Sequence, residues 1–255
     1  MNSVLEQLIT PMVMVGIRLG TLMSFAPFFG SNAISRRVKA GLTIVLTALV
    51  YPLCPLRLNV SDPLQFVQIA FGEAVIGLAL ALCMQFVFEG VRLAGQLLGF
   101  QIGFSLVNAI DPQTNVDTPV LSTLHETVIF LVFFRLSVDH WMLRALVKSF
   151  EYAPPGSVTV STLALQHLVV MAGRLFGIGA EIAAPVLAVT LLIDLALGLI
   201  ARVAPQVPVL FLGMSVKSLV GMGVLLGAVG WWPKLFERYF EEVFRGTERL
   251  IILMH

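Results

Sequence analysis

The sequence predicts an all-α membrane protein. Of its 255 residues, 58% are hydrophobic and only 12% are charged, whereas soluble domains usually carry about a quarter charged residues. Long apolar stretches recur along the chain, and none shows the two-residue alternation of a membrane β-barrel strand. Because no long polar stretch separates two cores, we expect one membrane-embedded domain over residues 1–255. The net charge of +1 gives no electrostatic basis for binding nucleic acid.

Seven apolar stretches are candidates for helices. They cover residues 8–29, 38–54, 64–88, 91–107, 120–136, 163–201 and 207–232. A helix needs about 20 residues to cross a bilayer, so 38–54 and 91–107 are short for spanning. The stretch 163–201 is long enough for two helices, and Pro185 predicts a kink or a break between them.

Two segments of the chain carry distinct charge patterns. Arg36, Arg37 and Lys39 form the clearest basic cluster, which favours a cytoplasmic position for that turn. The tail 233–255 mixes charged residues with Phe and Leu at helical spacing. We therefore expect the tail to form an amphipathic surface helix.

A ladder of glycines precedes a polar loop in the middle of the chain. Gly95, Gly99 and Gly103 are four residues apart, and this spacing places small residues on one helix face where another backbone can approach closely. The segment 108–119 then offers polar, turn-prone backbone between two apolar stretches. Such backbone is tolerated at membrane depth only when it is buried in protein or lines a water-filled cavity. The loop is therefore either part of an interior passage or a turn exposed outside the membrane.

Several charged residues lie within apolar sequence. These residues are Arg18, Glu73, Arg174, Glu181, Asp194 and Lys217. Each would be costly against lipid, so each should face protein or water. Small residues accompany several of them, as Gly198 lies one turn after Asp194. The charges could serve an ion or proton relay, or they could be buried pairs that fix helix contacts.

The later charges need partners on other helices. Asp194 and Arg202 are eight residues apart, which is about 12 Å along a helix axis and too far for a direct pair. We expect Asp194 and Lys217 to be buried with partners on other helices, with a mutual pair among the options. The four histidines are scattered, and none has the HExxH spacing of a metalloprotease. No catalytic, cofactor-binding or metal-binding residue is predicted.

Residues 194–221, DLALGLIARVAPQVPVLFLGMSVKSLVG, form the most specific motif in the chain. The run D-x-x-x-G-x-x-x-R-x-x-P-Q, followed by an apolar stretch, a Lys and a Gly, resembles the FliR family of flagellar export-gate subunits. Further landmarks of the resemblance are Arg18 with Pro27, RRVKAGL at 36–42, GEAVIG at 72–77, AGQLLGFQIGFS at 94–105 and PVL at 119–121. Val207-Pro208 departs from the pattern, in which a polar residue followed by an apolar one is expected.

The resemblance implies a subunit of a hetero-oligomeric export gate built from kinked helical hairpins. Its partners would be FliP and FliQ, a FlhB-type gate protein and unfolded export substrates, at the flagellar basal body in the bacterial inner membrane. Residues 1–160 would be a FliP-like part and 161–255 a FliQ-like part. The resemblance implies no enzymatic activity, and it favours a role at interfaces for Arg18, Glu73, Asp194, Arg202 and Lys217.

The resemblance also gives the central loop a role as the plug of the closed pore. By position the plug comprises Leu106, Val107, Asn108, Ala109, Ile110, Asp111, Pro112, Gln113, Thr114 and Asn115. Two alternatives stay open. One is the homologous subunit of a virulence type III secretion system. The other is a proton-coupled secondary transporter with Glu73 or Asp194 as the carrier, which should show paired repeats with interrupted helices.

Overall fold

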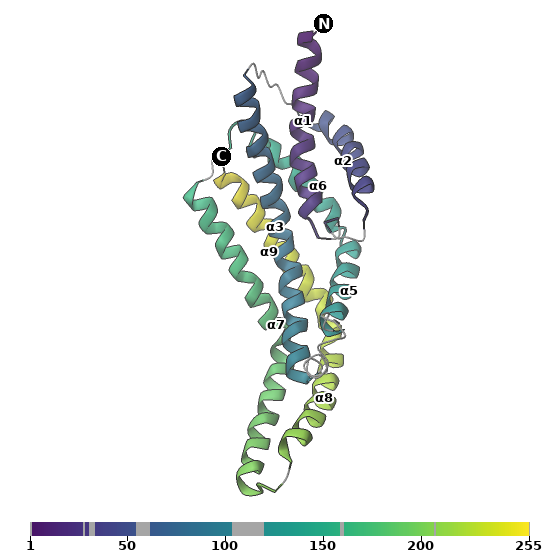
Figure 1. Ribbon diagram of the computed structural model, residues 1–255, viewed down its shortest axis with the longest axis vertical. Helices are drawn as coiled ribbons and strands as arrows, with labels where there is room; N and C mark the ends of the chain where they lie inside the picture. The colour runs from purple at the N-terminus through teal and green to yellow at the C-terminus, as the bar shows by residue number, and fades with distance from the viewer. Residues whose placement is uncertain are drawn as a thin grey trace. The chain divides into compact units, whose positions relative to one another are not determined.

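A computed structural model describes residues 2–27, 29–30, 34–54, 62–103, 120–158, 161–206 and 208–254. Every regular element in these ranges is a helix (Figure 1), which confirms the predicted all-α fold. The elements in chain order are α1 (Asn2–Phe25), α2 (Arg36–Val50), η1 (Tyr51–Leu53), α3 (Pro63–Ile102), α5 (Val120–Arg135), α6 (Val138–Tyr152), α7 (Thr162–Val203), α8 (Val209–Ala228), η3 (Val229–Trp231) and α9 (Trp232–Leu253).

The helices confirm a membrane protein. Among the described residues, three helical segments are long and apolar enough to cross a membrane: Pro63–Ile102, Thr162–Val203 and Phe211–Leu253. The bent pair α5 and α6 adds a fourth if it is one broken span. α3 has 40 residues, which corresponds to about 60 Å, roughly twice the thickness of a hydrocarbon core. A simple perpendicular crossing therefore does not account for its length.

Two of the predicted stretches belong to one helix. The stretch 64–88 and the first part of 91–107 form the single helix α3, which ends at Ile102 and whose intervening Glu89 forms an ion pair with Arg92. Of the kink or break predicted at Pro185, the break is absent, because α7 is continuous from Thr162 to Val203. A proline removes one hydrogen bond, to the carbonyl four residues earlier, and helices at membrane depth tolerate this loss when they pack against protein.

α6 was not among the predicted apolar stretches. Its buried residues are Val138, Met142, Ala145, Leu146, Ser149 and Phe150. This spacing defines one face of an amphipathic helix, and the charged residues on its other face lower the average hydropathy. α5 and α6 meet at a bend of 65°, and Ser137 at this bend has a left-handed backbone, with φ of 52°.

Polar side chains cap the first turns of three helices. The side chain of Ser35 accepts a hydrogen bond from the backbone N–H of Val38 at the start of α2, and Asp62 accepts one from Leu64 at the start of α3. Ser161 accepts from the N–H of Ala164 at the start of α7 and donates to the carbonyl of Leu253 in α9. These caps satisfy N–H groups that have no partner within their own helix.

The chain folds into two compact units, each assembled from segments that are distant in sequence. Unit 1 comprises residues 1–87, 133–173 and 240–255, and unit 2 comprises residues 88–132 and 174–239. Both units draw on residues before and after position 160. The predicted parts 1–160 and 161–255 therefore describe a different division of the chain, which stays a prediction.

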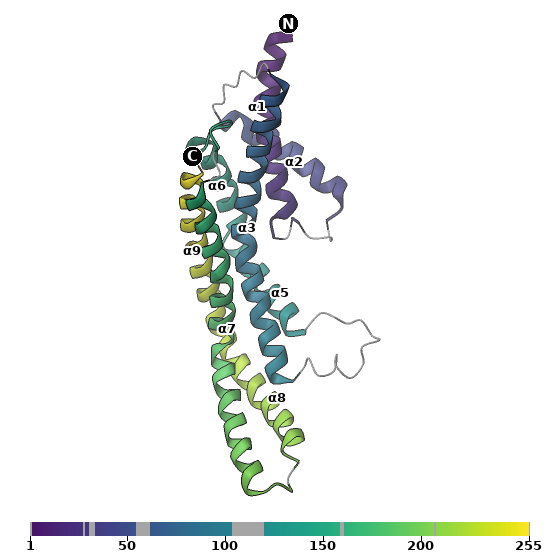
Figure 2. The ribbon, with the colours of Figure 1, turned by 60° about the vertical axis from the view of Figure 1, so that its left-hand side comes forward.

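Unit 1 is organised around α1. α2 packs beside α1 (Figures 1 and 2), and the first part of α3, α6, the start of α7 and the end of α9 complete the unit. Its fully buried side chains include Met14, Leu19, Leu22, Ile76, Met84, Phe133 and Phe240.

Unit 2 contains the helical hairpin formed by the second part of α7 and by α8, which are joined through residues 204–208 (Figure 2). The end of α3, most of α5 and the start of α9 complete it. α8 begins at Val209, directly after Pro208 at its N-cap. The buried side chains of unit 2 include Val91, Leu98, Ile102, Ile129, Val186, Trp232 and Phe236.

Candidate functional site

An arginine and a glutamate pair in the interior of unit 1. The Nε and Nη2 atoms of Arg18 in α1 donate to the two carboxylate oxygens of Glu73 in α3, at 2.7 and 3.0 Å. Both side chains are 0% exposed. Two parallel hydrogen bonds between a guanidinium and a carboxylate are among the strongest polar contacts in proteins. The pair therefore offsets part of the cost of burying two charges.

Further contacts of Arg18 bring α6 into the same network. Its Nη1 donates to Oγ of Ser149 at 2.7 Å, and its Nη2 donates to the carbonyl of Ala153 at 2.9 Å. The guanidinium also lies 3.9 Å from the ring centre of Phe150. Arg18 thus connects α1, α3 and the end of α6, so a change at this one side chain would disturb all three.

Glycine brings α1 and α3 close enough for this pairing. Gly77 lies one turn after Glu73, and a Cβ atom there would overlap the backbone carbonyl of Arg18. Gly16 and Gly20 of α1 face a different neighbour, because Cβ atoms there would lie 3.6 and 3.4 Å from the threonines of α2 at positions 47 and 43. Glycines therefore permit close contact of α1 with both neighbours: those of α1 itself toward α2, and Gly77 of α3 toward α1.

The glycine ladder contributes a close contact between α3 and α5 in unit 2. A Cβ at Gly95 would lie 2.7 Å from the backbone nitrogen of Ser122. The hydroxyl of Ser122 donates to the carbonyl of Arg92, and the guanidinium of Arg92 pairs with Glu126 at 3.0 Å. The backbones of the two helices are thus in contact, with an ion pair at the edge.

The other predicted packing glycines differ from Gly95. Gly99 is buried in α3. Gly103 lies just past the last residue of α3 and has a φ of 95°, so it ends the helix rather than packing within it, as is usual for glycine at this position. A Cβ at Gly198 would have no described atom within 4 Å. Any packing contact of Gly198 must therefore be sought outside the described part of this chain.

A second glycine contact joins α3 to α7 and was not predicted. A Cβ at Gly90 would lie 2.9 Å from the side chain of Ile178 and from the carbonyl of Leu175. A Cβ at Gly179 would lie 3.2 Å from the carbonyl of Gly90. Glycines on two different helices form this contact. A four-residue spacing of glycines within one stretch could not predict this contact between two helices.

Asp194 and Lys217 form an ion pair across the α7–α8 hairpin. The amide of Gln101 in α3 lies 3.5 Å from the same carboxylate. In this chain 42% of the Asp194 side chain and 22% of the Lys217 side chain are exposed. Neither is buried within the chain, so their predicted burial would have to come from another molecule and stays a prediction. Arg202 is also exposed, in the last turn of α7.

Glu181 gathers three partners from α7 and α9. Its carboxylate pairs with Arg174 at 2.9 Å and with Arg238 at 2.6 Å, and it accepts from the hydroxyl of Tyr239 at 2.9 Å. Arg174 and Glu181 are seven residues apart and so share one face of α7. The ion pairs are more than a third exposed, so each contributes little stability by itself.

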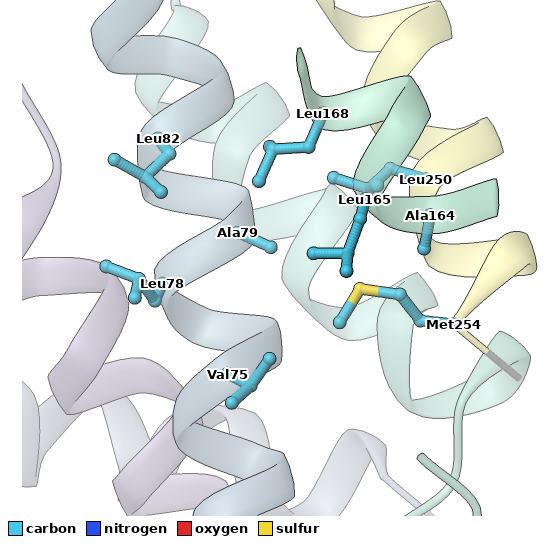
Figure 3. A pocket seen from close by; sticks show the side chains of 9 residues that line it. All are labelled: Val75, Leu78, Ala79, Leu82, Ala164, Leu165, Leu168, Leu250 and Met254. Atoms are coloured by element: carbon cyan, nitrogen blue, oxygen red, sulfur yellow. The ribbon is translucent and has the colours of Figure 1, made fainter. Parts of the chain in front are cut away.

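The described residues offer little for binding a cofactor. They contain no cluster of three or more His, Cys, Asp or Glu side chains that could hold a metal ion. A groove in unit 1 is lined only by apolar side chains of α3, α7 and α9, with Leu82 and Leu168 on facing walls (Figure 3). Such a lining offers no polar group to orient a substrate. His125 is buried, with Nδ1 2.7 Å from the carbonyl of Leu121 and its ring against Trp232.

The predicted plug, Leu106 to Asn115, lies outside the described residues. Its role therefore stays a prediction.

The α7–α8 hairpin exposes most of its apolar surface. Only 22% of the most apolar window of α7, and 17% of that in Phe211–Leu253, is buried within the chain. The exposed side chains of the hairpin include Leu191, Leu195, Leu199, Phe211, Leu219 and Leu226. Surfaces of this kind must be covered by lipid or by other proteins.

Comparison with known proteins identifies the family. Residues 9–243 match the model of a family described as "Bacterial export proteins, family 1". The flagellar biosynthetic protein FliR of Pectobacterium carotovorum is 32% identical over 231 residues, covering 89% of this chain and 87% of that protein. The chain belongs to the FliR family. FliR of Escherichia coli K12 is 29% identical over 228 residues, which cover 89% of this chain and 87% of that protein. FliR of Bacillus subtilis 168 is 29% identical over 231 residues, which cover 89% of this chain and 88% of that protein.

The match to the FliR family includes the ion pairs of Arg18 with Glu73 and of Asp194 with Lys217. Arg18, Glu73, Asp194 and Lys217 all lie within residues 9–243. The last turns of α9, which carry the buried residues Leu250 and Ile251, lie beyond the matched range. Family membership was predicted from the motif at 194–221, and the comparisons confirm it.

We expect Glu73→Gln to destabilise the protein by about 3–5 kcal/mol, because Arg18 would be left as a buried charge without its carboxylate. The matched control is Glu89→Gln, which removes one partner of the half-exposed Arg92 and should cost at most about 1 kcal/mol. Both are measured as thermal stability in detergent by fluorescence-detected size exclusion, on the protein together with the subunits that co-purify with it. The double variant Arg18→Met with Glu73→Leu should recover part of the loss. Equal stability of the two single variants would contradict the structural role of this pair.

We expect Gly95→Leu to disrupt the contact between α3 and α5. Overpacking costs about 1–3 kcal/mol where neighbours can adjust, and the neighbour here is the backbone of Ser122. The control Gly173→Leu adds the same side chain where no described atom lies within 4 Å. The measurement is the yield of monodisperse protein, together with the subunits that co-purify with it, from membranes after a heat step. If both variants tolerate the step equally, this face of α3 is not a packing surface.

Proposed function

We propose that the chain is a subunit of the flagellar type III protein export gate. In this role it forms, with FliP and FliQ subunits, the closed pore through which unfolded flagellar proteins leave the cell. Its place would be the inner membrane at the flagellar basal body. Membership of an export-protein family and the FliR names of its relatives support this function.

The observation that carries the proposal is the exposed face of the α7–α8 hairpin. Asp194 and Gly198 lie on α7 among exposed leucines, and both line a groove between α7 and α8 together with Gly213 and Lys217. Lipid is a poor neighbour for a half-exposed charge. Small residues beside a polar group instead favour contact with another membrane helix. A partner subunit covers this face better than lipid does.

Pairing within the chain favours a structural role for Glu73 over proton transport. Both of its carboxylate oxygens accept from Arg18, and the side chain has no exposed surface. A proton carrier must exchange protons with water on both sides of the membrane, which a buried bidentate pair hinders. We therefore propose that the protein is not an enzyme or a carrier and acts by assembling with its partners.

The proposal includes a division of labour along the chain. Residues 1–160 form the FliP-like part and residues 161–255 the FliQ-like part, whose α7–α8 hairpin presents the exposed face described above. A FlhB-type gate protein is a further proposed partner, and unfolded export substrates are the proposed cargo. Because the relatives described above are flagellar proteins, they favour a flagellar system over a virulence system.

Co-expression tests the proposed assembly. We expect the chain expressed alone in mild detergent to aggregate or be degraded, because its hairpin face has no partner. Co-expression with FliP and FliQ from the same organism should give a discrete complex that contains all three proteins. A monodisperse, stable monomer of the chain alone, with no FliP or FliQ bound on co-expression, would count against the gate.

We expect Gly198→Leu to reduce binding of the partner subunits without disturbing packing inside the chain, because the added side chain enters space that is open in the chain itself. Gly227→Leu is the control, since it adds the same group to open space on α8, away from the groove residues. The readout is the amount of FliP and FliQ recovered per tagged chain. Equal recovery for the two variants would show that the groove at Gly198 is not the partner-binding surface.

A further inference from the structure

α2 has two unlike faces. Its inner face packs on α1, where Thr43 and Thr47 meet the glycines at positions 20 and 16. Its outer face carries Val38, Ile44, Val45 and Leu49, which are 57–66% exposed. Figures 1 and 2 both show α2 beside α1. An apolar stripe of this kind on the outside of a helix needs an apolar environment.

The charges of α2 are concentrated at the end of this stripe. Arg36 and Arg37 are exposed at the start of the helix, Lys39 follows within the first turn, and that turn contains no acidic residue. Positive charges are unfavourable at a helix N-terminus, where the backbone dipole is itself positive. Residues that oppose a local preference in this way are typical of binding sites. The electrostatics of α2 therefore call for an anionic group outside the helix.

α2 is too short to cross a bilayer by itself. Its 15 residues extend for about 22 Å, which is shorter than a hydrocarbon core of about 30 Å. A short helix with an apolar stripe and a basic end suits the boundary between headgroups and acyl chains, where its apolar face enters the acyl region.

We propose that α2 is a lipid-docking helix that recognises anionic phospholipid. Its outer face, Val38, Ile44, Val45 and Leu49, contacts acyl chains, and Arg36 and Arg37 bind lipid phosphates. The planar guanidinium fork matches phosphate geometry, and a helix lying at the boundary can hold its basic end at the headgroups while its apolar face contacts the acyl chains. The inference depends on the protein being in a membrane and is independent of which subunits form the gate.

Quenching by brominated lipid tests the proposal. An environment-sensitive fluorophore is attached at Val45→Cys on the outer face of α2 in the full-length chain, reconstituted into nanodiscs with whatever subunits co-purify. The two native cysteines are buried, and the unsubstituted protein controls for their labelling. A label at Glu241→Cys, on the exposed polar side of α9, is the position control. The nanodiscs contain brominated phosphatidylcholine alone, or with about one-third of it replaced by phosphatidylglycerol that carries the same brominated acyl chains, as the anionic lipid.

Lipid docking predicts strong quenching at position 45 and little at position 241. Quenching at 45 should rise with the anionic lipid and fall as salt is raised, because the attraction is screened. In the same nanodiscs, Arg36→Gln with Arg37→Gln should weaken the response of quenching at position 45 to anionic lipid, because each arginine contributes about fivefold to the attraction. The control Arg245→Gln, an exposed arginine of α9, should leave that response unchanged.

Three results would overturn the proposal. One is the absence of quenching at position 45 in nanodiscs, which would mean that protein covers this face. Another is quenching that does not respond to anionic lipid, and the last is an equal response to anionic lipid in the double arginine variant and in Arg245→Gln. A failure of FliP and FliQ to co-purify would bear on the proposed gate and would leave these three readouts intact.

Discussion

The pair of Arg18 and Glu73 is the contact on which unit 1 depends. It places two opposite charges where neither side chain is exposed, and contacts from α3 and from the end of α6 satisfy the guanidinium, which itself belongs to α1. In a chain with so little charge, a buried ion pair does more to specify one arrangement of helices than apolar contacts, which many arrangements could supply. Gly77 makes the pairing possible because it lets α3 approach the backbone of α1.

The helices of unit 2 are held together more by close backbone contacts than by a buried ion pair such as that of unit 1. Gly95 faces Ser122 on α5, and Gly90 and Gly179 bring α3 against α7. Its ion pairs lie at the edges of these contacts and are partly exposed. Membrane helices gain little from hydrophobic association, so close packing of small residues is the main source of attraction between them.

The exposed surfaces of the two units have different chemistry, and this difference separates the two proposals. The α7–α8 groove combines small residues with the pair of Asp194 and Lys217, which suits a protein helix. The outer face of α2 combines large apolar side chains with arginines at one end, which suits lipid. In the isolated chain each surface leaves apolar side chains exposed, and each therefore needs a different covering.

The sequence by itself determined the helical membrane class, the family and the presence of charges that require partners. Each of these depends on a local property of the chain: its composition, a short motif, or the position of a charged residue within an apolar stretch. It did not settle helix boundaries where contacts decide them: α7 has no break at Pro185, and α3 joins the stretch 64–88 to the first part of 91–107. Only the tertiary structure decided that Arg18 pairs with Glu73, 55 residues away, and that Gly90 meets Gly179. Those pairings depend on which helices become neighbours, and spacing within a single helix carries no information about the helix it will face.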